Sequence, residues 1–328
     1  MSNYQYLVPK PTQRILEQKH GACLNLELIL ARYLPREIID DRSKQGPWLR
    51  DMIRRFDQTG MKSHLQAYYS RWRAMIGDAY TFNGRLQGRL VVGLGGKGPL
   101  EFGLTLQHVT GLPIIPGSAL KGMTRAYALL VIAADLATQR GAQSFLSDGE
   151  DKALAALDQA LAAKSRTPRD LPDAGAATDH LNLSVKDLCA LLDAHADAEH
   201  FRRAFGSNDA GGVCVFYDAV VSGMATGRPL FEVDVMTPHF VKYYNAGNAG
   251  ARLEPPHDGD SPNPVNFLTV AQGTRFAFAV GLRRTVSRTD RPEAEAARSK
   301  AVEWMKAALY ELGVGSKTAA GYGVFRIG

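Results

Sequence analysis

The sequence predicts an α+β fold with a βαββαβ core, and three observations carry this prediction. The composition, with 45% apolar and 22% charged residues, suits a globular protein with a buried core. Residues 212–221, GVCVFYDAVV, have the apolar and aromatic character of a buried strand. Residues 292–312 show the 3.6-residue period of a helix, with Pro292 near its start and Gly313 just after its end.

The predicted core elements follow a simple order along the chain. They are a strand (80–94), a helix (118–138), a strand (212–221), a strand or hairpin (265–283), a helix (292–312) and a last strand (321–327). This order is that of the ferredoxin-like, or RRM-like, fold, which serves many unrelated functions. Some sheets of this kind bind RNA through aromatic side chains. These strands lack that signature, so we expect any RNA contact to involve loops.

Residues 1–79 are predicted to form a helical N-terminal extension packed on the core. Its helices are expected near 22–33, 47–56 and 60–77. The remainder, 80–328, is predicted to be one domain.

Two inserts interrupt this predicted domain. The first, at about 139–205, is helical and acidic, and a helix over 183–206 closes it. The second lies at about 222–266. Its first extended segment begins at 231–244 and leads into a polar, turn-forming stretch.

Charge is distributed unevenly along the chain. Residues 1–147 hold 19 Lys and Arg against 10 Asp and Glu, whereas residues 148–200 hold 5 against 11. A basic surface attracts polyanions, although charged side chains also serve simply to solvate a protein. On charge alone both interpretations stay open.

The cysteines and the apolar segments indicate the expected compartment. Cys23, Cys189 and Cys214 are far apart and match no zinc or disulfide spacing, so we expect reduced thiols. The first residues, MSNYQYLVPK, lack the apolar stretch of a signal peptide, and the longest apolar run, 126–137, is too short for a membrane span. The sequence therefore predicts a cytoplasmic protein, and no cofactor is expected.

The stretch GVGSKTAAGYG, residues 313–323, is a candidate phosphate-binding loop. It fails the P-loop pattern because Ser316 and Glu311 stand where that pattern requires glycine. Successive amides of a glycine-rich loop can still bind an anion. The alternative is a glycine helix cap followed by a tight turn. The candidate residues are Gly313, Gly315, Ser316, Lys317, Thr318, Gly321, Tyr322 and Gly323.

The stretch GLPIIPGSALKGMTRAY, residues 111–127, is a second candidate. Ser118, next to Gly117, is expected to cap a helix whose free N–H groups point outward. Lys121 and Arg125 are four residues apart and therefore share one face of that helix. A positive helix end with two cations suits a backbone phosphate. An ordinary capped helix with solvated cations is the alternative.

Candidate catalytic and metal-binding groups are few. His195 and His200 have near-helical spacing, but no third ligand is evident, so no metal site is expected. His108 and His239 lie in predicted loops, where either could act in acid–base cleavage of RNA if a partner group were present. The glycine pattern GLGGKG, residues 93–98, is not followed by a helix start and is interpreted as a turn.

Three stretches, taken in order, resemble a known family. GLPIIPGSALKGMTRAY, AFGSNDAGGVCVFYDA and GVGSKTAAGYG are similar to motifs of the RAMP superfamily of CRISPR effector proteins. VDVMTPHFVKYYN and PNPVNFLTVAQGTRFAF narrow the resemblance to the sixth subunits of type III-B (Cmr) effector complexes. The resemblance covers roughly residues 80–328. The N-terminal helices and the acidic insert within this range of the chain match no motif of the family.

The resemblance implies a role as well as a fold. Members of this family have a ferredoxin-like core with a C-terminal glycine-rich loop, bind CRISPR RNA and cap the complex near the 3′ end of the guide. Target cutting belongs to a neighbouring subunit, through an aspartate loop with no match in this sequence, so the implied role is not catalytic. The implied partners are CRISPR RNA, target RNA, the backbone RAMP subunit, a small helical subunit and the capping RAMP subunit.

The resemblance also implies site residues. The loop at 313–323 matches the glycine-rich RNA-contacting loop of the family. The contact with the RNA backbone at a helix start is matched by Gly117, Ser118, Lys121 and Arg125. The region 232–266 looks like a hairpin "thumb" that inserts beside the guide–target duplex, carrying His239, Lys242, Tyr243 and Tyr244.

Two alternatives to this role stay open. One is an endoribonuclease that processes CRISPR RNA through His108 or His239. The other is a scaffold that contacts only proteins, with the acidic insert and the basic N-terminal region as docking faces.

Overall fold

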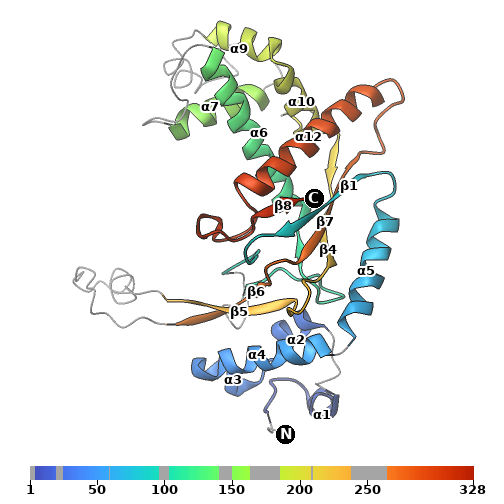
Figure 1. The fold of residues 1–328 in the computed structure, drawn as a ribbon, viewed down its shortest axis with the longest axis vertical. Helices are drawn as coiled ribbons and strands as arrows, with labels where there is room; N and C mark the ends of the chain where they lie inside the picture. The colour runs from blue at the N-terminus through green and yellow to red at the C-terminus, as the bar shows by residue number, and fades with distance from the viewer. Residues whose placement is uncertain are drawn as a thin grey trace, which may run out of the picture.

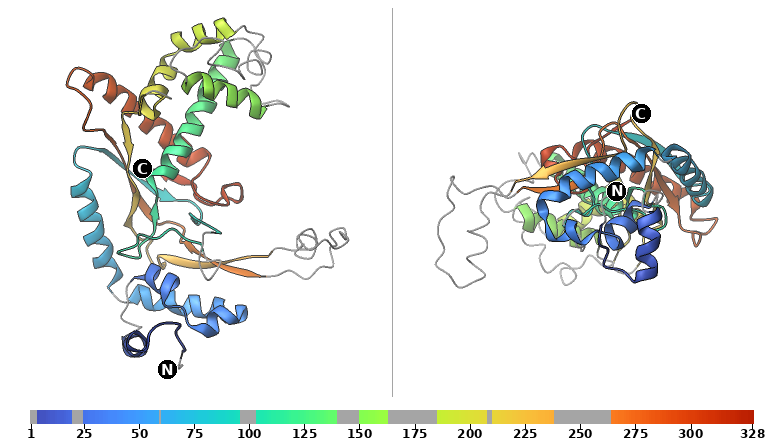
Figure 2. Two further views of the ribbon diagram at one scale, coloured as in Figure 1. Left: turned by 180° about the vertical axis from the view of Figure 1, so that it is seen from behind. Right: turned by 90° about the horizontal axis from the view of Figure 1, so that it is seen from below.

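The overall shape is elongated, with three groups of elements along the long axis (Figure 1). A sheet lies in the middle, the N-terminal helices and a two-stranded hairpin lie at one end, and a helical insert lies at the other (Figures 1 and 2). Within the described residues, no helix is both long and apolar enough to cross a membrane. The computed structural model describes residues 4–19, 25–58, 60–95, 103–139, 150–162, 185–207, 210–237 and 264–328.

Among the described residues, six strands form the central sheet, all paired antiparallel. Its order is β2-β4-β7-β1-β8, and β3 also pairs with β7. The mixed α/β architecture predicted from the sequence is therefore confirmed. The strands are β1 (Tyr80–Leu86), β2 (Ile114–Ile115), β3 (Cys214–Phe216), β4 (Ala219–Gly223), β7 (Arg275–Leu282) and β8 (Phe325–Ile327).

Side-chain alternation in β1 shows how the sheet acquires two different faces. Phe82, Gly84 and Leu86 are buried toward the core, whereas Asn83 and Arg85 point to the other face and are exposed. A Cβ at Gly84 would lie 3.1 Å from Phe278 and 3.2 Å from Phe325, so this glycine makes room for the aromatic core.

Two long helices cover the core face of the sheet. In α12 (Arg291–Glu311), alanines at helical spacing are fully buried, which allows this helix to approach the sheet closely. Trp304 from the same helix fills the space beside Phe205, with ring centroids 6.1 Å apart. The helices are α6 (Gly117–Gln139) and α12 (Arg291–Glu311).

A third helix, α5 (Met61–Met75), packs on the opposite face of the sheet at its β4 side. Trp72 and Ile76 pack there against Val220 and Ala277 in a small apolar cluster. The indole Nε1 of Trp72 donates a hydrogen bond to the carbonyl of Asp218 at 2.9 Å. This helix covers only part of the face.

The predicted strand over 212–221 is wrong in one respect, because it divides into β3 and β4 at Asp218. The carboxylate of Asp218 accepts the N–H of Gly117 at 2.7 Å, at the start of α6. A Cβ at Gly117 would lie 2.1 Å from the carbonyl oxygen of Phe216, so the start of α6 packs directly against the backbone where β3 ends. These tertiary contacts interrupt a sequence that is apolar on both sides of Asp218.

Two other predicted segments differ from the structure: the first strand is shorter than expected, and the strand or hairpin expected over 265–283 is two strands that do not pair with each other. The strand expected over 80–94 ends at Leu86, although Leu90 still forms a bridge to Val270. The segment 265–283 holds two strands in different sheets, β6 (Val265–Val270) and β7. A turn separates them: Gly273 has a φ of 84° and the hydroxyl of Thr274 donates to the carbonyl of Ala271.

Strands β5 (Phe231–Met236) and β6 form a separate antiparallel hairpin that projects from the body (Figure 1). The N-terminal helices pack against its base, where the rings of Phe56 and Phe231 lie 5.5 Å apart. Asp41 accepts the Ser43 N–H at 3.0 Å, so the helix predicted from residue 47 begins earlier. These helices are α1 (Lys10–Lys19), α2 (Leu26–Arg32), α3 (Arg36–Asp40) and α4 (Arg42–Gln58).

The helix predicted over 183–206 is two helices, separated at His195, whose backbone is extended (φ −86°, ψ 111°). The second of them packs between α6 and α12 through Phe201 and Phe205, whose rings lie 5.1 Å apart. The described helices of the insert are α7 (Glu150–Ala162), α9 (Val185–Ala194) and α10 (Ala196–Phe205).

The packing of α12 predicts the effect of removing its largest buried side chain. Trp304 is 2% exposed, and Trp304→Ala should lower the free energy of unfolding by about 3–5 kcal/mol because it leaves a cavity. Tyr310, 63% exposed on the same helix, is the control, and Tyr310→Ala should change it by less than about 0.5 kcal/mol. Urea denaturation measures both, and equal effects would contradict the described core.

Candidate nucleic-acid interface

The closing loop, residues 313–323, contains glycines that the packing of its own backbone requires. Gly315 has a φ of 99°, and a Cβ there would lie 2.4 Å from the carbonyl oxygen of Val91. Gly323 has a φ of 68°, and its Cβ would lie 1.9 Å from the carbonyl oxygen of Val314. Both positions therefore need glycine for the fold itself, whether or not a ligand binds.

Most amides of the closing loop that were candidate anion donors bind carbonyls of the protein instead. The Ser316 N–H donates to Val91 at 2.8 Å, and the Gly323 N–H donates to Arg89 at 2.8 Å. The amides that remain candidates for binding an anion are therefore those at the tip of the loop. The N–H groups engaged in this way include those of Gly313, Val314, Ser316, Ala320, Gly321, Tyr322 and Gly323.

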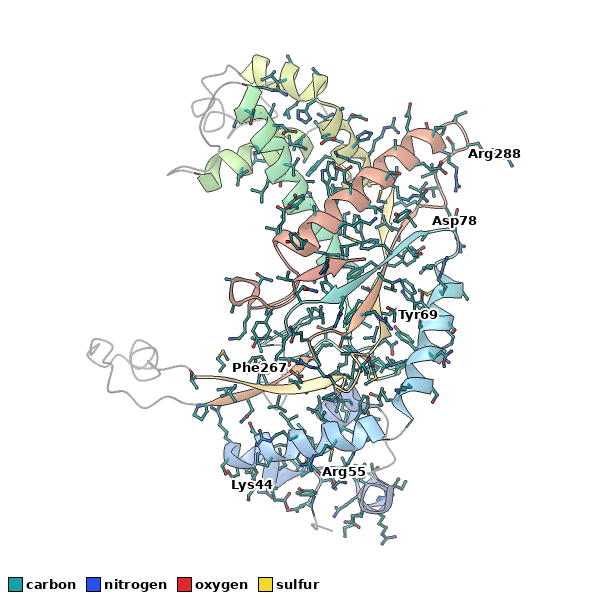
Figure 3. All side chains as sticks on the ribbon, in the orientation of Figure 1. Lys44, Arg55, Tyr69, Asp78, Phe267 and Arg288 are labelled. Atoms are coloured by element: carbon teal, nitrogen blue, oxygen red, sulfur yellow. The ribbon has the colours of Figure 1, made fainter. Side chains whose placement is uncertain are left out.

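Lys317 stands at this tip in an unusual conformation. It has a φ of 62°, and among the described residues it is the single non-glycine with positive φ. This left-handed conformation costs a lysine free energy, and such strain often marks functional sites. Its ammonium lies 5.4 Å from the centroid of the Phe267 ring on β6, a cation–π contact. Figure 3 shows Phe267 on the hairpin, on the side of the closing loop.

A second group of contacts joins the same loop to the hairpin. The guanidinium of Arg89 lies 2.9 Å from Glu232 and 2.7 Å from Asp234, both on β5. The hydroxyl of Tyr322 donates a hydrogen bond to Asp234. The Phe267 and Tyr322 rings also lie 6.5 Å apart. The closing loop and the hairpin are thus one connected unit.

Electrostatics in this junction favour a charged Asp234. Partial burial works to raise the pKa of Asp234, but hydrogen bonds from Tyr322 and the Val235 amide, together with Arg89, leave it below its ordinary value of 3.8. Burial and the Asp234 carboxylate raise the pKa of Tyr322. Arg89, held chiefly by Glu232, has its pKa raised further above the ordinary range.

The start of α6 does not have the predicted cap. The helix begins at Gly117, so Ser118 is its second residue rather than its N-cap. Because the Asp218 carboxylate already accepts the Gly117 N–H, an acidic group occupies the place expected for a phosphate.

The two cations of this helix point to different surroundings. Arg125 forms a two-pronged ion pair with Asp158 of α7, at 2.6 and 2.8 Å, and lies 5.1 Å from the centroid of the Phe201 ring. It therefore attaches the helical insert to α6. Burial raises the pKa of the Cys214 thiol on β3 to about 12, and the charges of Arg298 and Lys121 act in the opposite direction.

The remaining candidates are distributed as follows. The Nδ1 atom of His108 lies 3.1 Å from a carboxylate oxygen of Glu27, and His195 lies 3.7 Å from Asp135. No group of three or more possible metal ligands gathers among the residues that the structure describes. The thumb candidates lie outside the described residues, between the ends of β5 and β6: His239, Lys242, Tyr243 and Tyr244.

Sequence reasoning missed Arg89, Glu232, Asp234 and Phe267. The available signal was the pair of acidic residues alternating with apolar ones in FEVDV, which would place both carboxylates on one face of a strand. Nothing in the sequence shows that Arg89 faces them.

Comparison with known proteins gives the family. A family model described as the RAMP superfamily matches residues 84–326. The chain belongs to the RAMP superfamily. The resemblance seen in the three glycine-bearing motifs is therefore confirmed, and all three lie within the matched residues.

One curated relative and two solved structures are similar to this chain. The CRISPR system Cmr subunit Cmr6 of Pyrococcus furiosus is 32% identical over 262 residues, which are 78% of this chain and 71% of that protein. The crystal structure of Cmr6 from Pyrococcus furiosus has 28% identity and a TM-score of 0.45, covering 76% of this chain and 98% of that one. A cryo-EM structure of the type III-B Cmr-beta bound to cognate target RNA has 16% identity and a TM-score of 0.48, covering 96% and 87%.

The junction between loop and hairpin predicts a pH-dependent contribution to stability. Because the pKa of Asp234 is lowered on folding, its contribution is present above the unfolded pKa of about 4 and disappears as the pH falls through the folded value. Asp234→Asn should therefore lower the free energy of unfolding by about 1–3 kcal/mol at pH 7, with a difference that shrinks below pH 4.

Asp51→Asn is the matched control, because Asp51 forms an exposed pair with Arg55. It should change the free energy of unfolding by less than about 1 kcal/mol at pH 7. Denaturant unfolding from pH 3 to pH 7 measures both variants. A difference for Asp234→Asn that stays constant over this range would show that its charge does not matter.

Proposed function

We propose that this protein is a non-catalytic, CRISPR-RNA-binding subunit of a type III-B (Cmr) effector complex. Membership of the RAMP superfamily and the similarity to Cmr6 over most of both chains support the assignment. The structural observation that carries it is the strained Lys317, held by Phe267 at the junction of the closing loop and the hairpin. The left-handed backbone of Lys317 costs stability, and a functional role would explain why a lysine is kept at this position.

The core is proposed to be a ferredoxin-like RAMP domain. Four core strands lie side by side across the sheet in the order β4, β7, β1, β8. Numbered by their sequence along the chain, these are the second, third, first and fourth core strands. Both long helices cover one face, as that fold requires. The β5–β6 hairpin is proposed to be the thumb, since it projects from the body beside the closing loop (Figure 1).

Lys317 is proposed to contact a phosphate of the guide RNA, with the amides at the loop tip beside it. Contacts to phosphates position a nucleic acid without reading its sequence. This suits a subunit that must accept guides of any sequence, because pairing between guide and target then carries the specificity. The proposed partners are CRISPR RNA, target RNA and the other Cmr subunits: the backbone RAMP, small helical and capping RAMP subunits.

The composition of the native particle tests this assignment. A tagged chain isolated from its host should carry CRISPR RNA and the other Cmr subunits, identified by sequencing and by mass spectrometry. Recovery of the chain with partner proteins but without RNA would favour the protein-only scaffold instead. Cleavage of repeat RNA by the purified chain, lost in His108→Ala, would identify it as a processing nuclease.

Substitution of Lys317 tests the proposed contact. Lys317→Asn removes the charge but keeps a residue that tolerates positive φ, so the loop should fold normally. The salt dependence of guide RNA binding, as the slope of log K against log salt, should fall by about 0.7 for one lost phosphate contact. Lys10→Asn, at an exposed position of α1, is the control and should leave the slope unchanged. Identical slopes for the two variants would disprove the contact.

A further inference from the structure

Three arginines stand side by side across the central sheet. Arg85 on β1 is the Cα partner of Arg275 on β7, and it is also the partner of Arg326 on β8. Neighbouring strands are about 4.8 Å apart, so the three side chains start from adjacent points in one row. All three are exposed. This row, called here the arginine row, lies on the face of the sheet opposite α6 and α12.

The face that carries the arginine row is covered at one end and open at the other. Ala277 and Ala279 of β7 point to the same side as Arg275 and are buried under α5. The row lies beyond that covered part. The guanidinium of Arg275 lies over Gly223 of β4, where a Cβ would approach its Nη2 atom to 2.6 Å. Glycine therefore leaves room for this side chain to lie on the sheet.

The row has an electrostatic cost. Like charges directly opposite one another on adjacent strands destabilise a sheet. Two adjoining hollows, of about 570 and 450 Å³, share Arg85 and Arg326 in their walls, and no Asp or Glu is among the described residues that line them. The walls of these two hollows thus hold three neighbouring cations and no acidic side chain among the described residues, which favours an external anion as their partner.

A third hollow extends this surface to α5. It measures about 560 Å³ and is lined by Lys62 and Tyr69 of α5 and by Arg228, which it shares with the 450 Å³ hollow. Tyr69 stacks on Trp72, with ring centroids 6.0 Å apart and an interplanar angle of 25°, so its ring is firmly supported. Figure 3 shows Tyr69 on the side of α5 that faces the sheet.

A fourth hollow connects the same surface to the closing loop. It measures about 380 Å³ and is lined by Gly321 and Tyr322 of the loop, and by Arg228 and Gln272, which also line the 450 Å³ hollow. Its wall also holds Arg89 and Glu232, which form an ion pair with each other. A continuous path therefore runs from the closing loop, past Arg228, to the arginine row and α5.

We propose that this path is a binding site for single-stranded RNA. The arginine row holds consecutive phosphates, because a guanidinium can donate two parallel hydrogen bonds to one phosphate. Tyr69 stacks on a base at the α5 end, since aromatic stacking platforms beside a cationic track are the usual means of holding single strands. The supported aromatic ring favours RNA over an acidic protein segment, which would need only the charges.

The proposal rests on the proposed function only in that the chain meets RNA. The closing loop contacts one part of the strand, and the arginine row contacts another. Lys317→Asn and substitutions in the row therefore test separate statements, and either can fail alone.

The first experiment measures binding of a fluorescein-labelled 15-nucleotide oligouridylate by the full chain as a function of salt. The triple variant Arg85→Gln, Arg275→Gln, Arg326→Gln should lower the slope of log K against log salt by about 2, at about 0.7 for each lost phosphate contact. Its melting temperature should equal or exceed that of the wild type, because the repulsion is removed. The control is the triple variant Arg14→Gln, Arg50→Gln, Arg54→Gln at exposed positions of the N-terminal helices.

Equal slopes for the two triple variants would overturn the proposal, as would a wild-type chain that does not bind the oligonucleotide at 50 mM salt. Tyr69→Leu should weaken binding about 5- to 100-fold and Tyr69→Phe should restore it. Unchanged RNA binding with loss of a partner protein from the purified complex would show that the arginine row docks an acidic protein surface instead.

A second experiment identifies the strand. Complexes are assembled with 4-thiouridine either in the guide or in the target RNA and are then irradiated. Crosslinks to the peptide that contains Tyr69 are expected from one of the two, and these crosslinks should be lost in the arginine triple variant. Crosslinks from neither strand would contradict the proposed site while leaving the closing-loop contact intact.

Discussion

Asp218 joins the layers of the central domain. Its carboxylate accepts the first N–H of α6 on one side, and its carbonyl accepts the indole of Trp72 from α5 on the other. Both bonds require the strand to be interrupted, and the interruption lets Gly117 press against the backbone of Phe216. One consequence is functional. A helix start already occupied by a carboxylate repels a phosphate, so RNA contacts are expected elsewhere on the molecule.

The closing loop shows how a glycine-rich motif divides between folding and binding. Gly315 and Gly323 are required because the chain passes too close to Val91 and Val314 for any side chain. The amides around them bind protein carbonyls, so the motif is mainly a means of folding a tight loop. What remains for a ligand is its tip, where Lys317 departs from the pattern by holding a left-handed conformation without being glycine. The ion pairs of Arg89, whose carbonyl accepts the Gly323 N–H, hold the end of the loop beside the hairpin, and the contact of Lys317 with Phe267 holds the tip.

Periodicity was sufficient to predict α6, α12 and the mixed architecture, because each helix places one continuous apolar stripe on the sheet. It failed where a tertiary contact overrides local pattern, as at Asp218 and at His195 between α9 and α10. The site divides in the same way. The motif singled out Lys317. The helix start, the spacing of its two cations and the family resemblance placed Arg125 in the RNA site, whereas in the folded protein Arg125 pairs with Asp158 of the insert. Distant pairings of this kind leave no mark in a single sequence.

The arginine row is the extreme case of such a pairing. Arg85, Arg275 and Arg326 come from three separate stretches, and no single motif contains more than one of them. Only the antiparallel register on both sides of β1 places them together. Because stability alone would select against three adjacent cations, their position argues for a bound anion more strongly than the net charge does. The absence of an aromatic signature on the strands indicates that this sheet is no ordinary RRM platform. Yet this face offers a single RNA strand the two interactions of such a platform, phosphate contacts and base stacking, in a different arrangement. Here the strands contact the phosphates, and the base stacks on Tyr69 of the flanking helix.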